Sequence, residues 1–221
     1  NLLEAAVKNK IKKIISASSA SIYGLADKFP TKEIQHPYNN RTLYGAIKCY
    51  NEGLLRSYCD MYDLEYVVLR YFNVYGPRMD MHGAYTEVMI RWMEKLYQNE
   101  VPIIFGDGTD TMDFVHVEDI AKANILALLS DVSDIAFNIG TGVETSLNEL
   151  ANYLIDTFGQ NANPKYVSAR KVNPVSKRIA DTSMAKKHLG FSAEFDIKEG
   201  LKSLVDWWIN ARKQMDACKT D

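Results

Sequence analysis

Residues 13–24, KIISASSASIYG, join a short apolar run to a group of small hydroxyl side chains. The run at 13–17 predicts a buried strand, because it is short and rich in isoleucine. The segment from Ser18 to Gly24 follows directly, at what would be the carboxyl end of that strand. Open α/β sheets bind ligands at this edge. A serine-rich turn without a function produces the same pattern, so the segment alone does not identify a site.

Outward from this stretch, apolar runs alternate with helical patterns. Ser146 and Glu149 have the spacing of a capping box that opens a helix. Strands separated by helices of this length imply right-handed crossovers and a largely parallel sheet covered on both faces. The expected strands are 13–17, 65–72, 102–105, 114–117 and 135–139, and the expected helices are 1–9, 42–62, 85–98, 118–129, 146–158, 182–189 and 197–212.

Two helices have apolar residues at helical spacing, which lie near one face of the first and are expected to face inward in the second. In the helix at 42–62 these are Leu43, Ile47, Leu54, Leu55 and Tyr58. In the helix at 197–212 they are Leu201, Leu204, Val205 and Trp208.

The composition is that of an ordinary globular protein, with 47% hydrophobic and 24% charged residues among 221. The 26 basic and 28 acidic side chains leave a net charge of −2, which gives no general attraction to nucleic acid or to anionic membranes. No apolar run is long enough to span a bilayer. The three cysteines lack metal-ligand spacing and favour a reducing, cytoplasmic location. We expect no metal site, no nucleic-acid partner and no membrane partner.

Tyr44 and Lys48 are four residues apart in the predicted helix at 42–62, so their side chains share one helix face. A neighbouring ammonium group favours the phenolate form of tyrosine, which would make it a base usable at physiological pH. A chain with 13 tyrosines contains such a spacing by chance, so the pair alone does not identify a site.

Together, the strand, the serine-rich segment, a proline-bearing loop and the Tyr44-Gly-Ala-Ile-Lys48 helix resemble the extended short-chain dehydrogenase/reductase family. The nearest match is its nucleotide-sugar epimerase/dehydratase branch. The resemblance covers essentially the whole chain, because further segments agree in order. They are LRYFNVYGPR at 69–78, GDGT at 106–109, DFVHVED at 113–119, FNIGTG at 137–142, ADTS at 180–183 and LGF at 189–191.

The resemblance implies a Rossmann-like, doubly wound parallel sheet with a small α/β substrate-binding subdomain. It assigns residues 1–75 and 113–142 to the remaining part of the NAD-binding domain. Residues 76–112 and 143–221 would mainly form the substrate-binding subdomain. It also implies a homodimer through a four-helix bundle, formed by the helix that carries Tyr44 and the helix before it.

The same resemblance implies roles for single residues. Tyr44 would take the proton from a sugar hydroxyl, Lys48 would hold the nicotinamide ribose, and Ser19 would hydrogen-bond the reacting sugar oxygen. The cofactor would be NAD and the substrate a nucleotide-diphosphate sugar. The residues expected to bind the cofactor are Ala17, Ser18, Tyr44, Lys48, Tyr71 and Phe72. The residues expected to bind the substrate are Ser19, Ser21, Asn73, Arg91, Lys171 and Arg178.

Ala20 and Ser21 favour one branch of the family. Sugar dehydratases carry an Asp-Glu pair at these positions for the elimination of water, and sugar-acid decarboxylases keep a glutamate at the second. The chain has neither acid, so the resemblance favours epimerisation, in which the sugar is oxidised transiently to a keto-sugar and the hydride returns. A sugar ketoreductase or dehydrogenase needs the same residues and stays open, as does a non-catalytic binding or assembly module.

Two departures from the family pattern matter. The glycine-rich G-x-x-G-x-x-G fingerprint for the cofactor pyrophosphate is absent from the 221 residues. In the family it precedes the segments found here, so we expect Asn1 to lie inside a longer protein. We also expect the chain alone to be inactive and to bind NAD weakly. Met112 stands where many members have an arginine for the substrate diphosphate, and Arg91 or Arg178 would replace it.

Overall fold

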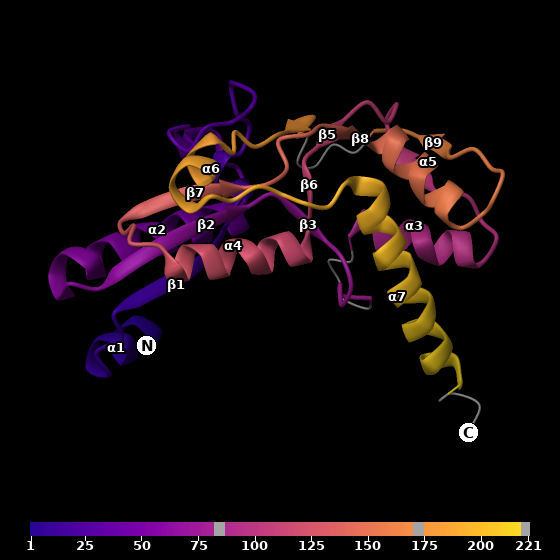
Figure 1. Ribbon diagram of the computed structural model, residues 1–221. Helices are drawn as coiled ribbons and strands as arrows, with labels where there is room; N and C mark the ends of the chain where they lie inside the picture. Colours follow the sequence, from indigo (N-terminus) through magenta and orange to yellow (C-terminus); the bar gives the residue numbers. More distant parts are fainter. Residues whose placement is uncertain (82–86, 170–174, 218–221) are drawn as a thin grey trace.

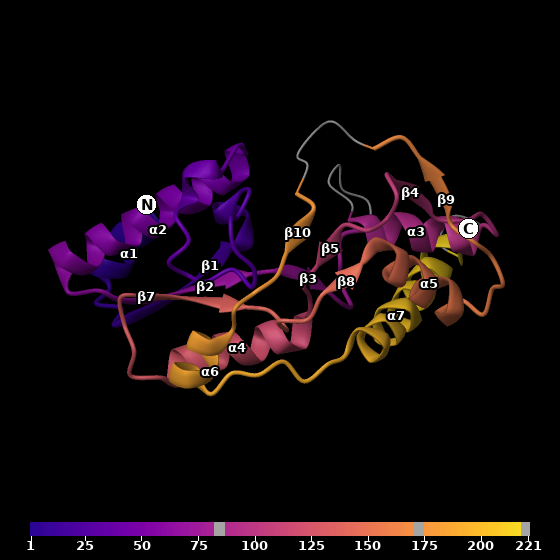
Figure 2. The same ribbon diagram turned by 90° about the horizontal axis from the view of Figure 1, so that it is seen from above.

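The computed structural model describes residues 1–81, 87–169 and 175–217. Its central sheet is parallel and has three strands in the order β1 (Lys13–Ser19), β2 (Glu65–Tyr71) and β7 (Ile135–Ile139). The helices α1 (Leu2–Lys8) and α2 (Leu43–Tyr62) lie on one face. The helices α4 (Val117–Leu129) and α6 (Ser183–Leu189) lie on the other (Figures 1 and 2). The expected α/β fold with a parallel sheet is confirmed.

The middle strand β2 is apolar along its length because both of its faces are covered. Val67 and Leu69 pack into the cluster under α4, whereas Tyr66 and Val68 pack with Leu55 of α2 on the opposite face. Alternate side chains of a strand point to opposite faces, so one continuous apolar run supplies the packing on both faces of the sheet.

A second core lies beside the sheet and surrounds the buried Trp208. It is built by three helices, α3 (Val88–Tyr97), α5 (Leu147–Thr157) and α7 (Ile197–Ala217). Short strands lie within this part and between it and the sheet (Figure 2). They are β3 (Asn73–Tyr75) with β6 (Phe114–His116), β4 (Ile103–Phe105) with β9 (Lys165–Val167), and β10 (Lys177–Arg178) with β5 (Thr111–Met112) and β8 (Thr145–Ser146).

The chain crosses between the two cores several times. Helix α6 belongs to the range 143–221, yet Ala185 and Leu189 pack in the cluster under the central sheet. Helix α7, which follows it, returns to the core around Trp208. The division into 1–75 with 113–142 and 76–112 with 143–221 stays a prediction. No helix in the described part of the chain is both long and apolar enough to cross a bilayer.

The expected ends of several elements agree with the structure. The capping box of Ser146 and Glu149 is present, and Gly190 ends α6 in the left-handed conformation at φ 66°. The apolar residues that were expected near one face of α2 differ in burial. Leu55 is buried, but Leu43 is 79% exposed and Ile47 is 49% exposed. These two side chains belong to the first turns of α2 and lie on its solvent-facing side.

Candidate functional site

The end of β1 turns sharply at Ser19. This residue caps a short 3-10 helix, η1 (Ala20–Tyr23), and its Oγ accepts a hydrogen bond from the backbone N–H of Ser21 at 3.1 Å. The serine-rich segment is therefore a turn with a defined geometry at the carboxyl edge of the sheet. This is the edge at which ligands bind in open α/β sheets.

Helix α2 starts directly over this turn. Thr42 caps it, because its Oγ1 accepts from the N–H of Gly45 at 3.1 Å. A Cβ at Gly45 would lie 2.5 Å from the backbone oxygen of Ser21, so only glycine permits this approach. The contact places the first turn of α2, which carries Tyr44, against the segment that carries Ser19 and Ser21.

Lys48 extends from α2 to the end of β1. Its Nζ donates to the backbone oxygen of Ala17 at 2.9 Å and lies 5.6 Å from the centre of the Tyr44 ring. An ammonium group has three donors, so two remain for other groups. The Tyr44 side chain is 56% exposed, which leaves its ring open to a ligand at this edge. The structure thus brings Ala17, Lys48 and Tyr44 together as expected from the sequence.

The remaining residues expected to bind the cofactor have side chains engaged within the protein. The buried Ser18 donates from Oγ to Oε1 of Glu52 at 2.5 Å. Tyr71 is the register partner of Ser19, but its hydroxyl exchanges hydrogen bonds with Asn124 of α4. Phe72 is buried in a small cluster with Tyr23. Their roles toward the cofactor stay predictions.

The residues expected to bind the substrate are spread over several elements. Asn73, on β3, donates from Nδ2 to the backbone oxygen of Asp113 at 2.9 Å. Arg91 lies exposed on α3, and Arg178 lies half-buried on β10, beside Met112 of β5 in register. Lys171 lies outside the described residues.

Arg178 lies in a poorly solvated environment. Burial lowers the pKa of its guanidinium, and Glu87, directly before α3, opposes this shift. Burial also raises the pKa of Glu87, against the attraction of Arg91 and Arg178. Among the described residues, no hydrogen bond or ion pair satisfies the Arg178 side chain. A desolvated guanidinium of this kind suits an anionic ligand.

Asp113 joins three of the segments on which the family resemblance rests. Its fully buried carboxylate accepts from the N–H and the hydroxyl of Thr141, at 2.8 and 2.7 Å, and from the N–H groups of Gly142 and Ala180, at 2.8 and 3.2 Å. These four bonds hold the loop after β7 and the loop after β10 against β6.

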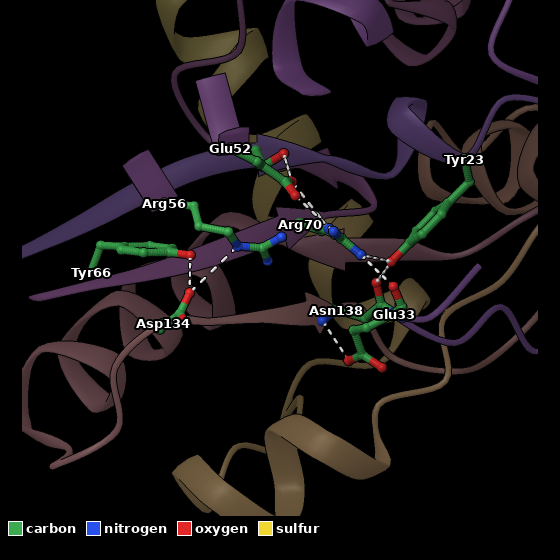
Figure 3. A network of polar contacts seen from close by, with 9 residues as sticks. Tyr23, Glu33, Glu52, Arg56, Tyr66, Arg70, Asp134 and Asn138 are labelled. Atoms are coloured by element: carbon green, nitrogen blue, oxygen red, sulfur yellow. Dashed lines mark hydrogen bonds and ion pairs between the residues drawn. The ribbon is translucent and has the colours of Figure 1, made fainter. Parts of the chain in front are cut away.

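Sequence reasoning did not identify the polar network under α2 (Figure 3). Glu52 pairs with Arg70 of β2, and Arg70 also donates to the hydroxyl of Tyr23 at 3.0 Å. Burial would lower the pKa of Arg70, but its hydrogen bonds to Glu52 raise it overall. Burial raises the pKa of Tyr23 to about 12. Two signals were present in the sequence: a charge inside the apolar strand 65–72, and an acid four residues after Lys48.

Comparison with known proteins identifies the family. The pattern of the NAD dependent epimerase/dehydratase family matches residues 1–140. The chain belongs to this family. A putative UDP-glucose 4-epimerase of Methanocaldococcus jannaschii is 40% identical over 211 residues, which are 95% of this chain and 67% of that protein.

Solved structures of epimerases agree with this assignment. The UDP-glucose 4-epimerase of Thermotoga maritima with UDP-glucose superposes with a TM-score of 0.89 at 38% identity, over 96% of this chain and 68% of that one. The UDP-glucose 4-epimerase of Thermus thermophilus in complex with NAD superposes with a TM-score of 0.84 at 28% identity, over 95% and 68%. The chain therefore spans about two thirds of the length of the family members that it matches.

The residues present fit one end of the family's cofactor. Lys48 keeps two donors for the hydroxyls of a ribose, and Tyr44 stands exposed beside it. Both lie over the carboxyl end of β1, where a nicotinamide ring would meet the sheet. For the pyrophosphate, the 221 residues contain no G-x-x-G-x-x-G loop. Ala17, Tyr44 and Lys48 would thus hold the nicotinamide end of NAD.

Proposed function

We propose that this chain carries the catalytic and substrate-binding residues of an NAD-dependent UDP-sugar 4-epimerase. The observation that supports the proposal most is the arrangement of Ser19, Tyr44 and Lys48. A hydroxyl, a phenol and an ammonium group lie at one edge of a parallel sheet, and the hydrogen bond from Lys48 to Ala17 holds them there. Two of the related proteins named above are a putative UDP-glucose 4-epimerase and a UDP-glucose 4-epimerase with UDP-glucose. We therefore propose UDP-glucose as the substrate of this chain as well.

The residues of this chain would act on the 4-hydroxyl of the sugar. Bound NAD would supply the site with a reversible hydride acceptor. Tyr44 would take the hydroxyl proton as the hydride leaves and give it back on return. Ser19 would donate a hydrogen bond to the same oxygen as it becomes a keto group. Lys48 would orient the ribose and place its ammonium group beside the ring of Tyr44.

The turn after Ser19 supports epimerisation over elimination. Ala20 is buried, with a methyl side chain that cannot transfer a proton. The N–H of Ser21 donates to Oγ of Ser19, and neither Ala20 nor Ser21 carries a carboxylate. An active site of this kind supports oxidation and re-reduction of the sugar, without the acid–base pair needed to remove water.

The substrate diphosphate would lie against β5 and β10. Arg178 would supply the principal contact, since its guanidinium is desolvated beside Met112. Arg91 would contribute from α3. Phosphate and guanidinium form charge-assisted, bidentate hydrogen bonds, which a thioether at position 112 cannot provide.

The test uses the 221 residues joined behind the part of the Methanocaldococcus jannaschii relative that precedes the matched region, here called the joined protein. Interconversion of UDP-glucose and UDP-galactose is followed by chromatography. In the joined protein, Tyr44→Phe lowers kcat by about 10²–10⁴-fold, the usual contribution of a general base. The matched control is Tyr50→Phe, since Tyr50 is exposed on the same helix.

An unchanged rate in Tyr44→Phe contradicts the proposed function. Net consumption of NADH with a keto-sugar substrate, without epimerisation, identifies a reductase instead. Activity of the 221 residues alone with added NAD overturns the expectation that they do not turn over by themselves.

We further propose that the protein is a cytoplasmic homodimer that pairs through α1 and α2. Exposed apolar side chains support this, because Leu43, Ile47 and Tyr50 recur at helical spacing on α2 and Leu2 is exposed on α1. Light scattering tests the proposal: Ile47→Glu shifts a dimer to monomer. A monomeric wild-type protein contradicts it.

A further inference from the structure

Three polar residues form a row across the central sheet. Ser18 of β1 is paired in register with Arg70 of β2, and Arg70 is paired with Asn138 of β7. Each of the three is the second-to-last residue of its strand, on the face that Tyr66 and Val68 present to α2. An apolar core covered by a helix therefore ends in a polar row near the carboxyl edge of the sheet, and Figure 3 labels Arg70 and Asn138 of this row.

Glu52 of α2 contacts two members of this row. Its Oε1 accepts from the hydroxyl of Ser18 at 2.5 Å and from Nε of Arg70 at 3.1 Å, and its Oε2 accepts from Nη2 of Arg70 at 2.7 Å. The side chains of Arg70 and Glu52 are only 12% and 17% exposed. A bidentate pair in this setting has one favourable geometry, so it fixes the distance and the rotation of the two elements that carry it.

The Nη1 atom of Arg70 donates to η1 and to the loop that follows it. Nη1 donates to the hydroxyl of Tyr23 at 3.0 Å and to the backbone oxygen of Glu33 at 2.8 Å. Tyr23 in turn donates to Oδ1 of Asn138 at 2.6 Å. The network thus ties β1, β2, β7, α2 and the 20–33 segment to one guanidinium group.

Two adjacent residues of β1 are held by two residues of α2 that are one helical turn apart. Ala17 accepts from Lys48, and Ser18 donates to Glu52. Tyr44, Lys48 and Glu52 follow one another at intervals of four residues, so they share one face of α2. A shift of α2 along β1 cannot occur without breaking the contacts of Glu52.

We propose that Glu52 and Arg70 are positioning residues that set the register of α2 over β1 and thereby place Tyr44 and Lys48 for the reaction. The inference rests on the proposed function. A purely structural role would make the same pair necessary for folding but would leave the geometry of Lys48 unaffected in any variant that folds. The experiment therefore needs a local readout on Lys48 and a separate readout on the reaction.

The local readout is acetylation of lysine amines in the 221-residue chain, quantified by mass spectrometry. In Glu52→Gln one carboxylate oxygen becomes an NH₂ group, which cannot accept a hydrogen bond from Arg70. The bidentate contact between residue 52 and Arg70 is therefore lost. Lys48 then leaves Ala17 more often, and its acetylation rate rises about 3–10-fold, as for a locally opened contact. Lys13, which donates to the backbone oxygen of Ser130 at the opposite end of β1, serves as the internal reference and keeps its rate.

The matched control variant is Arg56→Gln. Arg56 lies one turn after Glu52 on α2 and pairs with Asp134 in an exposed setting (Figure 3). This variant leaves the acetylation of both lysines unchanged. Equal rates for Lys48 in wild type and Glu52→Gln, or a parallel rise at Lys48 and Lys13, overturn the proposal.

The second readout is the reaction of the joined protein. Glu52→Gln lowers kcat by about tenfold or more while the KM for UDP-glucose changes little, because small misplacements of reacting groups act on the chemical step. The double variant Glu52→Leu/Arg70→Met replaces the buried pair with apolar side chains, which is often neutral for stability. In the double variant the melting temperature returns to that of the wild-type joined protein, whereas kcat stays as low as in Glu52→Gln.

Recovery of both quantities in the double variant overturns the positioning role and shows a structural one. If the wild-type joined protein shows no epimerase activity, the proposed function fails. The acetylation experiment needs no activity, so it still decides whether Glu52 sets the position of Lys48.

Discussion

The Nζ atom of Lys48 lies 2.9 Å from the backbone oxygen of Ala17, although 30 residues separate the two in the sequence. The bond joins the second turn of α2 to the carboxyl-terminal part of β1. Tyr44 lies one turn before Lys48 on the same helix face, so one ligand at this edge can meet both groups.

Removing this ammonium group separates its role in the reaction from its role in stability. In the joined protein, Lys48→Met lowers kcat by about 10²-fold or more, since Tyr44 loses its cationic neighbour. The free energy of unfolding falls by no more than about 1.5 kcal/mol, the value of one hydrogen bond. Lys13→Met is the control: it removes a similar bond to the oxygen of Ser130 and leaves kcat unchanged. Equal kcat values for the two variants contradict the role of Lys48.

Restoring an arginine at position 112 tests the diphosphate site. In Met112→Arg a second guanidinium enters beside Arg178, so the free 221-residue chain melts at a lower temperature. With UDP added, Met112→Arg melts at a higher temperature than the wild type, because the new hydrogen bonds to a charged ligand contribute about 1.5–3 kcal/mol to binding. Calorimetry of UDP binding measures this. Leu129→Arg, at an exposed site on α4, controls for net charge and leaves UDP binding unchanged.

Two glycine-to-alanine changes have opposite expected signs. A Cβ at Gly200 of α7 would lie 2.0 Å from the hydroxyl oxygen of the buried Tyr75, so Gly200→Ala destabilises the protein by about 1–3 kcal/mol. A Cβ at Gly53 of α2 meets no atom within 4 Å, so Gly53→Ala stabilises it by about 0.5–1 kcal/mol. Urea unfolding of both variants measures the signs, and a stabilising Gly200→Ala would show that this packing is looser than described.

His116 makes stability depend on pH. Its Nε2 lies 3.0 Å from Oγ of Ser203, which itself donates to the oxygen of Gly200, so Nε2 carries the proton. Its Nδ1 accepts from the N–H of Glu118, and the ring is therefore neutral. Burial lowers the pKa of His116 in the folded protein.

The sign of the effect follows from proton binding. The unfolded chain takes up a proton near pH 6.5 and the folded protein does so only at lower pH, so stability is lost as pH falls from about 6.5 to the lowered value. The free energy of unfolding of the wild type should fall more steeply between pH 7.5 and 5 than that of His116→Gln. Parallel curves for the two proteins rule out this linkage.

Local signals in the sequence predicted the main elements. The capping box of Ser146 and Glu149 and the left-handed Gly190 depend only on neighbouring residues, and both are present. The strands at 13–17 and 135–139 were recognised because their apolar runs are continuous. The two-residue strands β5, β8 and β10 were not, since so few residues show no periodicity.

In the candidate site, too, the sequence predicted the contacts within one element and missed those between elements. Tyr44 and Lys48 share one helix, so their spacing was sufficient to predict that they act together. Glu52 and Arg70 meet only because β1 and β2 pair in register under α2. No local pattern contains that information. The exposure of Leu43 and Ile47 was also missed, because periodicity does not distinguish a face toward the core from a face toward solvent.

The repeated crossing between the two cores has a consequence for how the molecule can be divided. The strands β1, β2 and β7 and the helix α6 belong to one core, while α3, α5 and α7 are interleaved with them along the chain. A single proteolytic cut therefore leaves neither product with a complete interior. Truncation from the carboxyl end removes α7 first and exposes Trp92 and Leu150, so even short deletions there should yield aggregation instead of a smaller stable protein.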